Sequence, residues 1–335
     1  MATIKEVAEY ARVSVATVSR VVNNTGYVST DLRERVEQAM SSLNYKPSAL
    51  ARSLRRQETL TVGVLLPQLN QPFFSTLAFA MEKTLFASSY KTIICSSEED
   101  VAKEAAYIDM LLRQRVDGVL IVPTGQSVEN VNRLITGHVP AVLIDRDLPN
   151  MTINRVLTNN SDGACQAMRH LLELGHRRIA VIGGPPYSRA IEQRLHGIKR
   201  AFAELELPYD NRSTIMSTLT EFEMGYQIAH QLLGEAERPT AIFALTDVIA
   251  VGVLHAAADH QLSLPRDLSV VGFDDIPLAR FSIPSLTTVA QPIYEMGETA
   301  AALLLDQLRT GSPGSQTTTL ETRLEIRQST APPLG

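Results

Sequence analysis

The chain has 335 residues, enough for two or three domains with a large hydrophobic core. Hydrophobic residues make up 44% of it and charged residues 20%, as is ordinary for a soluble globular protein. The net charge of −5 argues against a protein that binds nucleic acid over its whole surface.

Charge is distributed unevenly along the chain. Residues 1–60 hold nine Lys and Arg against six Asp and Glu, whereas the remainder holds 22 against 30. A positive N-terminal part on a negative body fits a protein that contacts phosphate at one end only.

Cysteine and histidine usage offers no metal site. Cys95 and Cys165 each lie in an apolar pattern, which predicts buried free thiols in a reducing cytosol. Two cysteines cannot form an all-thiolate zinc site, and the seven histidines show no paired ligand spacing. The N-terminus lacks the apolar run of a signal peptide, and no stretch approaches 18 apolar residues. We expect a cytoplasmic protein with no cofactor and no membrane partner.

Three short helices are predicted in the first 46 residues. The first runs from Thr3 to Tyr10, with Thr3 as its cap and Glu6 three positions later. The second covers residues 15–23 behind the cap Ser14, and the third covers residues 30–43. A tight turn between the first two helices predicts a helix-turn-helix unit. A protein-binding helical bundle is the alternative.

The exposed face of the second helix favours DNA. Its valines face inward, and we expect Thr17, Ser19, Arg20 and Asn23 on the outside. Small side chains let a helix seat deeply in a major groove, and Arg20 can reach a guanine edge or a phosphate.

Residues 47–56 join this unit to the rest of the chain. Pro47 suits a helix start, and Leu50 and Leu54 would share one helical face beside a row of arginines. So short a helix is unstable alone in water, so we predict a hinge helix that forms against nucleic acid. An ordinary linker helix docked on the body is the alternative.

From Thr59 onward the periodicity changes to alternating strands and helices. A buried strand at 60–66 is followed by further strands near 92–95, 117–122, 140–144, 178–182, 240–244 and 268–273. Helical stretches are expected near 75–88, 102–113, 127–136, 161–174, 188–205, 222–234, 247–260 and 293–309. This alternation predicts parallel sheets with helices on both faces.

The length of this α/β part exceeds one comfortable sheet, which predicts two lobes. We expect a DNA-binding domain at 1–46, a linker at 47–58 and a ligand-binding and dimerisation domain at 59–335. Within the last, the expected first lobe comprises 59–160 and 292–322, and the second comprises 161–291 and 323–335. The C-terminal tail lacks an apolar heptad and so predicts no coiled coil.

Polar and aromatic residues follow the predicted strands, where open parallel sheets bind ligands. These strand-end residues are Gln71, Phe73, Phe74, Asp145, Arg146, Arg189, Arg194, Thr246, Asp247, Asp274, Asp275 and, after the short strand Thr287-Thr288-Val289, Gln291. Carboxylates and arginines can bind hydroxyls in pairs while aromatic rings cover a sugar's C–H face, so the set suits a small polyhydroxylated ligand.

Each residue of this set has a structural alternative. Phe73 and Phe74 could be core, Asp145 and Arg146 could pair with each other near the surface, and Asp275 could cap a turn. The sequence contains no nucleophile elbow, no P-loop and no dinucleotide fingerprint, so we expect no enzyme.

Several motifs together resemble the LacI/GalR family of bacterial transcription regulators. The resemblance runs from Thr3 to about Arg327, and its motifs are Thr3-Ile-Lys-Glu-Val-Ala, Val13-Ser-Val-Ala-Thr-Val-Ser-Arg-Val-Val-Asn, Asn44-Tyr-Lys-Pro-Ser-Ala-Leu-Ala-Arg-Ser-Leu, Arg115-Val-Asp-Gly, Leu174-Gly-His-Arg-Arg-Ile and Val271-Gly-Phe-Asp-Asp. The family implies an N-terminal all-α helix-turn-helix headpiece and a two-lobed α/β core like that of periplasmic sugar-binding proteins.

The resemblance also implies roles for single residues. Val15, Ala16 and Arg20 would choose the operator, and Leu54 would enter a minor-groove step and kink the DNA. The expected DNA-binding set is Thr3, Ser14, Val15, Ala16, Thr17, Ser19, Arg20, Asn23, Tyr27, Leu54 and Arg55. The expected effector-binding set is Gln71, Phe73, Phe74, Asp145, Arg146, Arg194, Thr246, Asp274 and Gln291.

Three positions depart from the family patterns. Gly26 replaces a base-contacting arginine of some members, and Thr246 replaces an asparagine of the ribose-binding pattern. The aromatic ring that this pattern has near Thr220 is missing at that position, with Phe222 as the candidate to compensate. The resemblance thus implies a homodimeric repressor that binds a pseudo-palindromic operator of a carbohydrate-utilisation operon and is released from DNA by a pentose or hexose. A purine- or phosphosugar-dependent regulator, or a sugar-sensing module without DNA binding, are the alternatives.

Overall fold

A computed structural model describes residues 2–23, 25–45, 58–125, 128–148, 150–218 and 221–334. The chain divides into two compact units, Met1–Thr59 and Leu60–Gly335, called here the N-terminal unit and the body. The predicted hinge helix, with Leu54 and Arg55, lies outside the described residues and stays a prediction.

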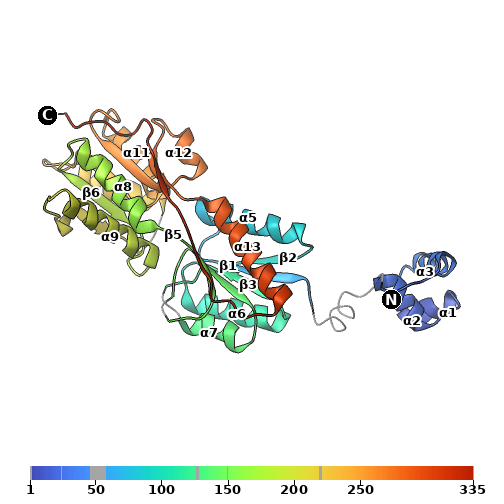
Figure 1. Cartoon of the computed structure of the whole chain (residues 1–335). Coiled ribbons are helices and arrows are strands. Elements are labelled where there is room, and N and C mark those ends of the chain that lie inside the picture. Colours follow the sequence, from blue (N-terminus) through green and yellow to red (C-terminus); the bar gives the residue numbers. More distant parts are fainter. Residues whose placement is uncertain are drawn as a thin grey trace. The chain divides into compact units, whose positions relative to one another are not determined.

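The described residues of the N-terminal unit form three helices, as predicted: α1 (Ile4–Tyr10), α2 (Val15–Asn23) and α3 (Thr30–Ser42) (Figure 1). The predicted capping box is confirmed, because the Thr3 hydroxyl accepts from the Glu6 amide while the Glu6 carboxylate accepts from the Thr3 amide. The Ser14 hydroxyl accepts from the Thr17 amide at 3.1 Å and so caps α2.

The core of this unit is small and aliphatic. Val7, Val18 and Val36, one from each helix, are fully buried against one another. Arg35 of α3 donates to the carbonyl of Ala11 at the end of α1 over 2.7 Å, which fastens the third helix across the turn. Sequence analysis did not find this arginine.

The first lobe of the body is built on a six-stranded parallel sheet. Its strands are β1 (Thr61–Leu66), β2 (Lys91–Ser96), β3 (Gly118–Ile121), β4 (Ala141–Ile144), β5 (Asn154–Thr158) and β11 (Thr317–Leu320), in the order β11-β5-β4-β3-β1-β2. Helices α5 (Pro72–Ala87) and α13 (Ile293–Thr310) pack on one face, and α6 (Val101–Gln114) and α7 (Val128–Thr136) on the other. Strand residues alternate between the faces, so Val64 and Leu65 enter different hydrophobic clusters.

The second lobe repeats this architecture. Its sheet contains β6 (Ile179–Gly183), β7 (Thr214–Met216), β8 (Ala241–Ala244), β9 (Ser269–Asp274), β10 (Thr287–Ala290) and β12 (Arg323–Glu325), in the order β12-β10-β9-β8-β6-β7, with only β12 antiparallel among the described pairs. Helices α8 (Asn160–Glu173) and α9 (Arg189–Glu204) cover one face. Helices α10 (Phe222–Leu233), α11 (Asp247–Asp259) and α12 (Pro277–Phe281) cover the other.

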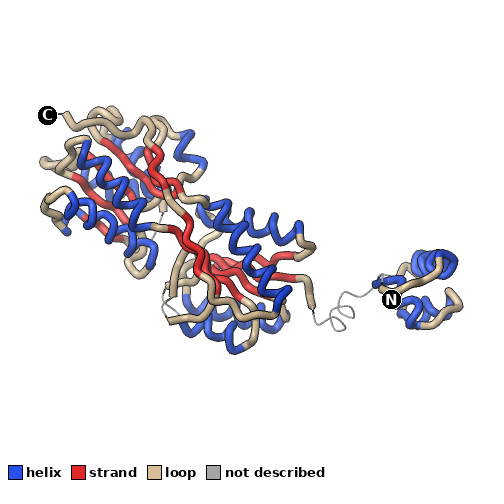
Figure 2. The backbone as a smooth tube through the Cα atoms, in the orientation of Figure 1, coloured by secondary structure: helices blue, strands red, loops and turns tan. Residues whose placement is uncertain are grey.

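The chain passes between the lobes three times. The passages are residues 158–160 from β5 to α8, residues 290–293 from β10 to α13, and residues 320–323 from β11 to β12 (Figures 1 and 2). The carboxyl ends of both parallel sheets therefore lie at the boundary between the lobes, which is where a ligand site is expected.

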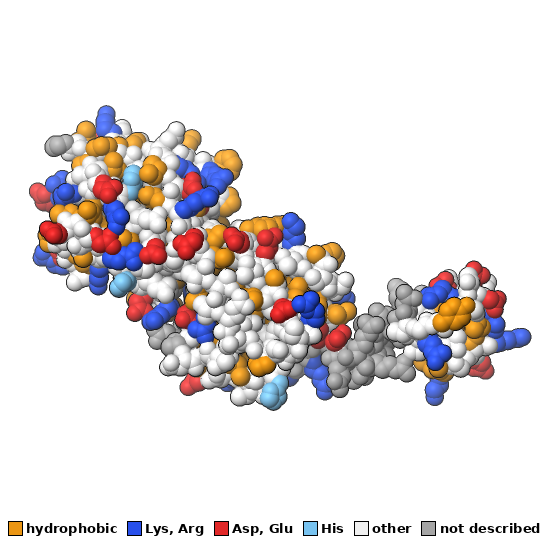
Figure 3. All heavy atoms as spheres, in the orientation of Figure 1, with side chains coloured by type: hydrophobic (Ala, Val, Ile, Leu, Met, Phe, Trp, Pro, Cys, Tyr) orange, Lys and Arg blue, Asp and Glu red, His pale blue; other side chains and the backbone are white. Residues whose placement is uncertain are grey.

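The surface and the buried thiols agree with the composition. On the face drawn in Figure 3, acidic and basic side chains are interspersed over the body without a large patch of either sign. Cys95 and Cys165 are buried free thiols, as predicted. Within the described parts of the chain, no helix has both the length and the apolar character needed to span a lipid bilayer.

The predicted fold class is confirmed, and the predicted bounds of most elements differ by one to three residues. Strands β5, β7, β11 and β12 and helix α12 were not predicted as elements. All five are only three to five residues long. Strands β7, β11 and β12 lie at sheet edges, and β11 is half-exposed with the polar sequence Thr-Thr-Thr-Leu. None of them carries a run of apolar residues that would mark it in the sequence.

Candidate functional site

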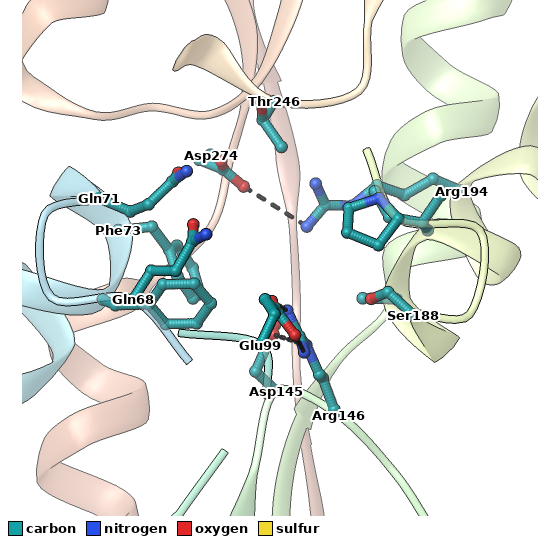
Figure 4. Close-up of a pocket in the computed structure, with 14 residues that line it drawn as sticks. Gln68, Gln71, Phe73, Glu99, Asp145, Arg146, Ser188, Arg194, Thr246 and Asp274 are labelled. Atoms are coloured by element: carbon teal, nitrogen blue, oxygen red, sulfur yellow. Dashed lines mark hydrogen bonds and ion pairs between the residues drawn. The ribbon is translucent and has the colours of Figure 1, made fainter. Parts of the chain in front are cut away.

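A small cavity of about 50 Å³ lies between the two lobes of the body. The first lobe contributes Gln68, Gln71, Phe73, Phe74, Glu99, Asp145 and Arg146, and the second contributes Pro185, Ser188, Ala190, Ile191, Arg194, Thr246 and Asp274 (Figure 4). Space for one water requires roughly 10–15 Å³ on this measure, so the cavity matches a handful of ligand oxygen positions.

Eight of the nine residues expected to bind the effector line this cavity. Gln291 does not, but its side-chain amide donates to Asp274 Oδ1 at 2.8 Å and so lies directly behind the lining. Arg189 is half-exposed and pairs with Glu192, and Asp275 pairs with Arg280 and Arg327 away from the cavity.

The aromatic rings come from the start of α5. Pro72 occupies the first turn of this helix, and Phe73 and Phe74 follow it with ring centroids 5.1 Å apart at an interplanar angle of 84°. Both rings belong to the hydrophobic core of the first lobe and both line the cavity. Core packing and ligand contact therefore do not exclude each other for Phe73 and Phe74, since each ring both packs in the core and lines the cavity.

Asp145 and Arg146 follow β4, and both are buried. They lie only at ion-pair distance from each other, 4.0 Å, because the guanidinium has a better partner: it donates to both carboxylate oxygens of Glu99, at 2.6 and 2.9 Å. The structural alternative of a pair near the surface is thus wrong, because both residues are buried. Burial works against the charge of Arg146, but the Glu99 carboxylate outweighs it and raises the Arg146 pKa.

Two buried polar atoms at this corner have no hydrogen-bond partner among the described residues. They are Asp145 Oδ1 and Arg146 Nε. An unsatisfied buried group costs about 1–3 kcal/mol, and a ligand hydroxyl can relieve both, because it accepts from an N–H and donates to a carboxylate. Asp145 also has a φ of 64°, a left-handed conformation that costs energy outside glycine and is often kept at binding sites.

Arg194 and Asp274 form the opposite wall. The Arg194 guanidinium donates to the Asn160 side chain at 2.8 Å and to the Leu245 carbonyl at 2.5 Å, and it lies 3.4 Å from Asp274 Oδ1. Its plane covers the ring of Phe273 with 3.7 Å to the centroid. Burial raises the pKa of Asp274 to about 6, although Arg194 and Gln291 favour its charged form.

A closed ring of polar contacts ties this wall to the lobe crossings. Asp274 accepts from Gln291, which accepts from the Thr158 hydroxyl at 2.7 Å. Asn160 donates to Thr158 at 3.1 Å and accepts from Arg194, which returns to Asp274. Thr158 and Asn160 lie in the first crossing and Gln291 in the second, so groups that face the cavity are bonded to segments that would bend if the lobes moved.

Thr246 and Asp247 have structural tasks as well. The Thr246 hydroxyl oxygen accepts from the Ile249 amide and caps α11, which leaves its O–H hydrogen to face the cavity. Asp247 is fully buried behind the wall, where it accepts from the Thr288 hydroxyl and the Ile276 amide. Burial, and then the nearby Asp274 carboxylate, raise the Asp247 pKa well above its ordinary value.

Sequence analysis missed six lining residues: Gln68, Glu99, Pro185, Ser188, Ala190 and Ile191. Glu99 follows the predicted strand near 92–95, so the strand-end rule applied to that strand would have found it. Gln68 lies two positions beyond the predicted strand at 60–66 and was within reach of the same rule. Ser188 lies farther from its strand, and Pro185, Ala190 and Ile191 are apolar, so none of these four carries such a signal.

Most of the described residues expected to bind DNA are exposed, several of them on α2. Ser14, Val15, Ala16 and Arg20 are exposed, and Tyr27 beyond the helix is 91% exposed. Thr3 is exposed and Thr17 partly so, although both hydroxyls also serve as helix-start contacts. The side chain of Asn23 lies outside the described residues.

Ser19 corrects one expectation, because it is only 7% exposed. Residues turn by about 100° along a helix, so Ser19 lies about 60° from Val22 and farther from Arg20. It belongs to the edge of the buried valine stripe and not to the exposed face.

A helix-turn-helix unit followed by a two-lobed body with a polar cleft defines a class of ligand-responsive DNA-binding regulators. Comparison with family models agrees. Residues 3–48 match the model of bacterial regulatory proteins of the lacI family, and residues 168–330 match a periplasmic binding protein-like domain.

Relatives extend the match to nearly the whole chain. The ribose operon repressor of Halalkalibacterium halodurans is 37% identical over 98% of this chain and 97% of its own length. The HTH-type transcriptional repressor PurR of Photorhabdus laumondii is 36% identical over 98% and 97%. The chain belongs to the lacI family of bacterial regulatory proteins.

Solved structures support both halves of the architecture. The lac repressor dimer bound to operator and the anti-inducer ONPF superposes with a TM-score of 0.86 at 31% identity, covering 98% of this chain and 99% of that one. A LacI family transcriptional regulator from Enterococcus faecium with bound ribose gives a TM-score of 0.75 at 34% identity, covering 81% of this chain and 99% of that one.

Proposed function

We propose that this chain is a sequence-specific DNA-binding repressor of a carbohydrate-utilisation operon, controlled by a pentose or hexose bound between the lobes. The observation that carries the proposal is the cleft itself, with two phenylalanine rings, two aspartate–arginine walls and the unpartnered atoms of Asp145 and Arg146. Relatives named ribose operon repressor and a ribose-bound family structure support the sugar class.

The DNA-binding half of the proposal rests on α2. Val15, Ala16 and Arg20 are exposed on this helix, and an arginine can read a guanine edge in the major groove. The lac repressor structure holds a dimer on an operator, and we extend this to a homodimer on a pseudo-palindromic site. The working state is cytoplasmic, which suits buried free thiols, and the cleft binds its ligand without catalysis.

Lobe closure is the proposed route of control. A sugar bound by both walls favours the closed arrangement, and the closed lobes move the segments that lead to the N-terminal unit. We expect the sugar to release the protein from DNA.

Replacing Arg20 by alanine tests the DNA-binding assignment. A lost bidentate arginine–guanine contact costs about 1–3 kcal/mol, so operator affinity should fall roughly 5- to 150-fold in a gel-shift or fluorescence-anisotropy titration near physiological salt. Arg309→Ala, which removes an exposed arginine of the body, is the charge-matched control and should leave operator affinity unchanged. Equal affinity of the parent and Arg20→Ala would refute the assignment.

A further inference from the structure

The charged groups that line the cavity are unequal in number. Arg146 and Arg194 are the two cationic side chains of the lining, and Glu99, Asp145 and Asp274 are its three acidic side chains. Asp247 adds a further carboxyl behind the wall. Acidic side chains therefore outnumber arginines in the lining by three to two.

Glu99 occupies the end-on pair of N–H groups of Arg146. Both terminal nitrogens are bonded to Glu99, and Nη1 also donates to the Pro123 carbonyl at 3.2 Å. The side-on edge is left, made by Nε and the second N–H of Nη2, and Asp145 Oδ2 already faces it at 4.0 Å from Nε. A phosphate or carboxylate is held best by two parallel N–H groups of one guanidinium. Here the end-on pair already holds a carboxylate, and an anion at the side-on pair would meet the Asp145 carboxylate.

Arg194 is engaged in the same way. Nε donates to Asn160, Nη1 donates to the Leu245 carbonyl, and Nη2 lies beside Asp274. An anion that displaced any of these partners would leave a buried carboxylate, amide or carbonyl oxygen without its donor, which is costly.

Helix starts also face the cavity and offer backbone N–H groups. Phe73 and Phe74 stand in the first turn of α5, and Ala190 and Ile191 in the first turn of α9. These donors serve the oxygen of a neutral hydroxyl as well as an anion. Pro72 removes one donor from α5, and Glu192 places a carboxylate in the first turn of α9.

We infer that the cleft selects an uncharged sugar and rejects its phosphorylated or carboxylated counterparts, and that Glu99 is the residue that sets this preference. Glu99 neutralises the charge of Arg146 and occupies its end-on pair of N–H groups. Its carboxylate also lines the cavity, and the Glu99 side chain is 13% exposed. The inference rests on the proposed sugar-regulated function and adds the charge class of the ligand.

Glu99→Gln separates this role from simple support of the pocket. Glutamine keeps the size and one acceptor oxygen but removes the charge, so part of the Arg146 fork becomes available to an anion. Binding of neutral pentoses and hexoses, and of the corresponding terminal sugar phosphates, is measured by isothermal titration calorimetry on the full chain.

In the parent protein we expect a neutral sugar to bind at least about 100-fold more tightly than its phosphate, a ratio equivalent to roughly 2.7 kcal/mol. In Glu99→Gln this ratio should shrink at least about tenfold, chiefly because the phosphate binds more tightly. Glu99→Asp, which keeps the charge, should restore most of the preference.

Glu98→Gln is the matched control. Glu98 is the neighbouring residue, but its side chain is 72% exposed and pairs with Lys103 at 2.7 Å on the surface. Its substitution should leave both affinities and their ratio unchanged.

The remaining outcomes distinguish a failure of this inference from a failure of the proposed function. Tight binding of a sugar phosphate to the parent, or an unchanged ratio in Glu99→Gln, overturns the inference and leaves a sugar-regulated repressor standing. Binding of neither neutral nor phosphorylated sugars overturns the proposed effector class, and the inference with it.

Discussion

Asp274 combines an unusual backbone conformation, burial and a raised pKa in one residue of the cleft. It ends β9 with a φ of 121°, in a region that L-residues rarely adopt, and it is 5% exposed. Burial raises its pKa to about 6, while the Arg194 guanidinium and the Gln291 amide act in the opposite direction. The folded protein therefore holds a carboxyl group that changes charge near physiological pH, at a position where a ligand would bond to it.

Sugar affinity should consequently depend on pH. A sugar hydroxyl that donates to Asp274 favours the ionised form, so affinity should be highest above pH 7 and should fall by up to tenfold per unit below about pH 6. Burial also raises the pKa of Asp145, whose protonation would act in the same direction.

Calorimetric titrations from about pH 5 to about pH 8 measure this dependence. Asp274→Asn carries no titrating proton and should bind more weakly with a flatter pH profile. Identical affinities of the parent protein at both ends of that range would show that Asp274 does not bond to the sugar as an acceptor.

At the scale of elements, the helix pair α10 and α11 packs with almost no space between the backbones. Gly225 and Gly252 stand at the crossing, and a Cβ placed on Gly252 would lie 2.6 Å from the Tyr226 amide nitrogen. No side chain can be moved aside there, since the obstacle is backbone. These glycines are needed for the close approach and not for an unusual φ.

Gly252→Ala should therefore destabilise the body. We expect a loss of about 1–3 kcal/mol from overpacking, despite the better helix propensity of alanine, seen as a lower urea midpoint by circular dichroism. Gly234→Ala at the end of α10 is the control, because its Cβ would meet nothing nearer than 3.5 Å. If both variants unfold at the same midpoint, the close approach does not limit stability.

The helices and strands also determine how much of the fold and of the site could be predicted from the sequence. The alternation of apolar runs and amphipathic helices predicts the lobes, and the strand-end rule reaches Asp145, Arg146 and Asp274 because their strands are unmistakable. Glu99 was missed since the short strand β2 is largely exposed at the sheet edge and was not examined for its end.

The partner of each charged side chain could not be read from the sequence. Arg146 and Glu99 are 47 positions apart, and Arg35 and Ala11 are 24 apart. Such pairs depend on how the chain folds back and on burial, and local periodicity has no information about either. The prediction that Ser19 is exposed was wrong for a related reason. Its polar side chain suits an exposed face, but its angular position on α2 places it beside the buried valines.

At the scale of the whole molecule, the account depends on coupling between the cleft and the DNA-binding unit. The ring of contacts through Asp274, Gln291, Thr158, Asn160 and Arg194 joins the ligand wall to two of the three lobe crossings. A ligand that favours one arrangement of these crossings shifts the lobes by its differential affinity and by no more. Coupling free energies of about 1–3 kcal/mol are typical of such systems.

The most direct test is operator affinity of the full chain, measured by fluorescence anisotropy at fixed salt, with and without a saturating sugar found by thermal-shift screening. We predict that the sugar weakens operator binding by roughly 5- to 150-fold and, by reciprocity, that operator DNA weakens sugar binding by the same factor. Operator affinity that is the same with the sugar bound as without it would contradict the account, and tighter operator binding would reverse its sign.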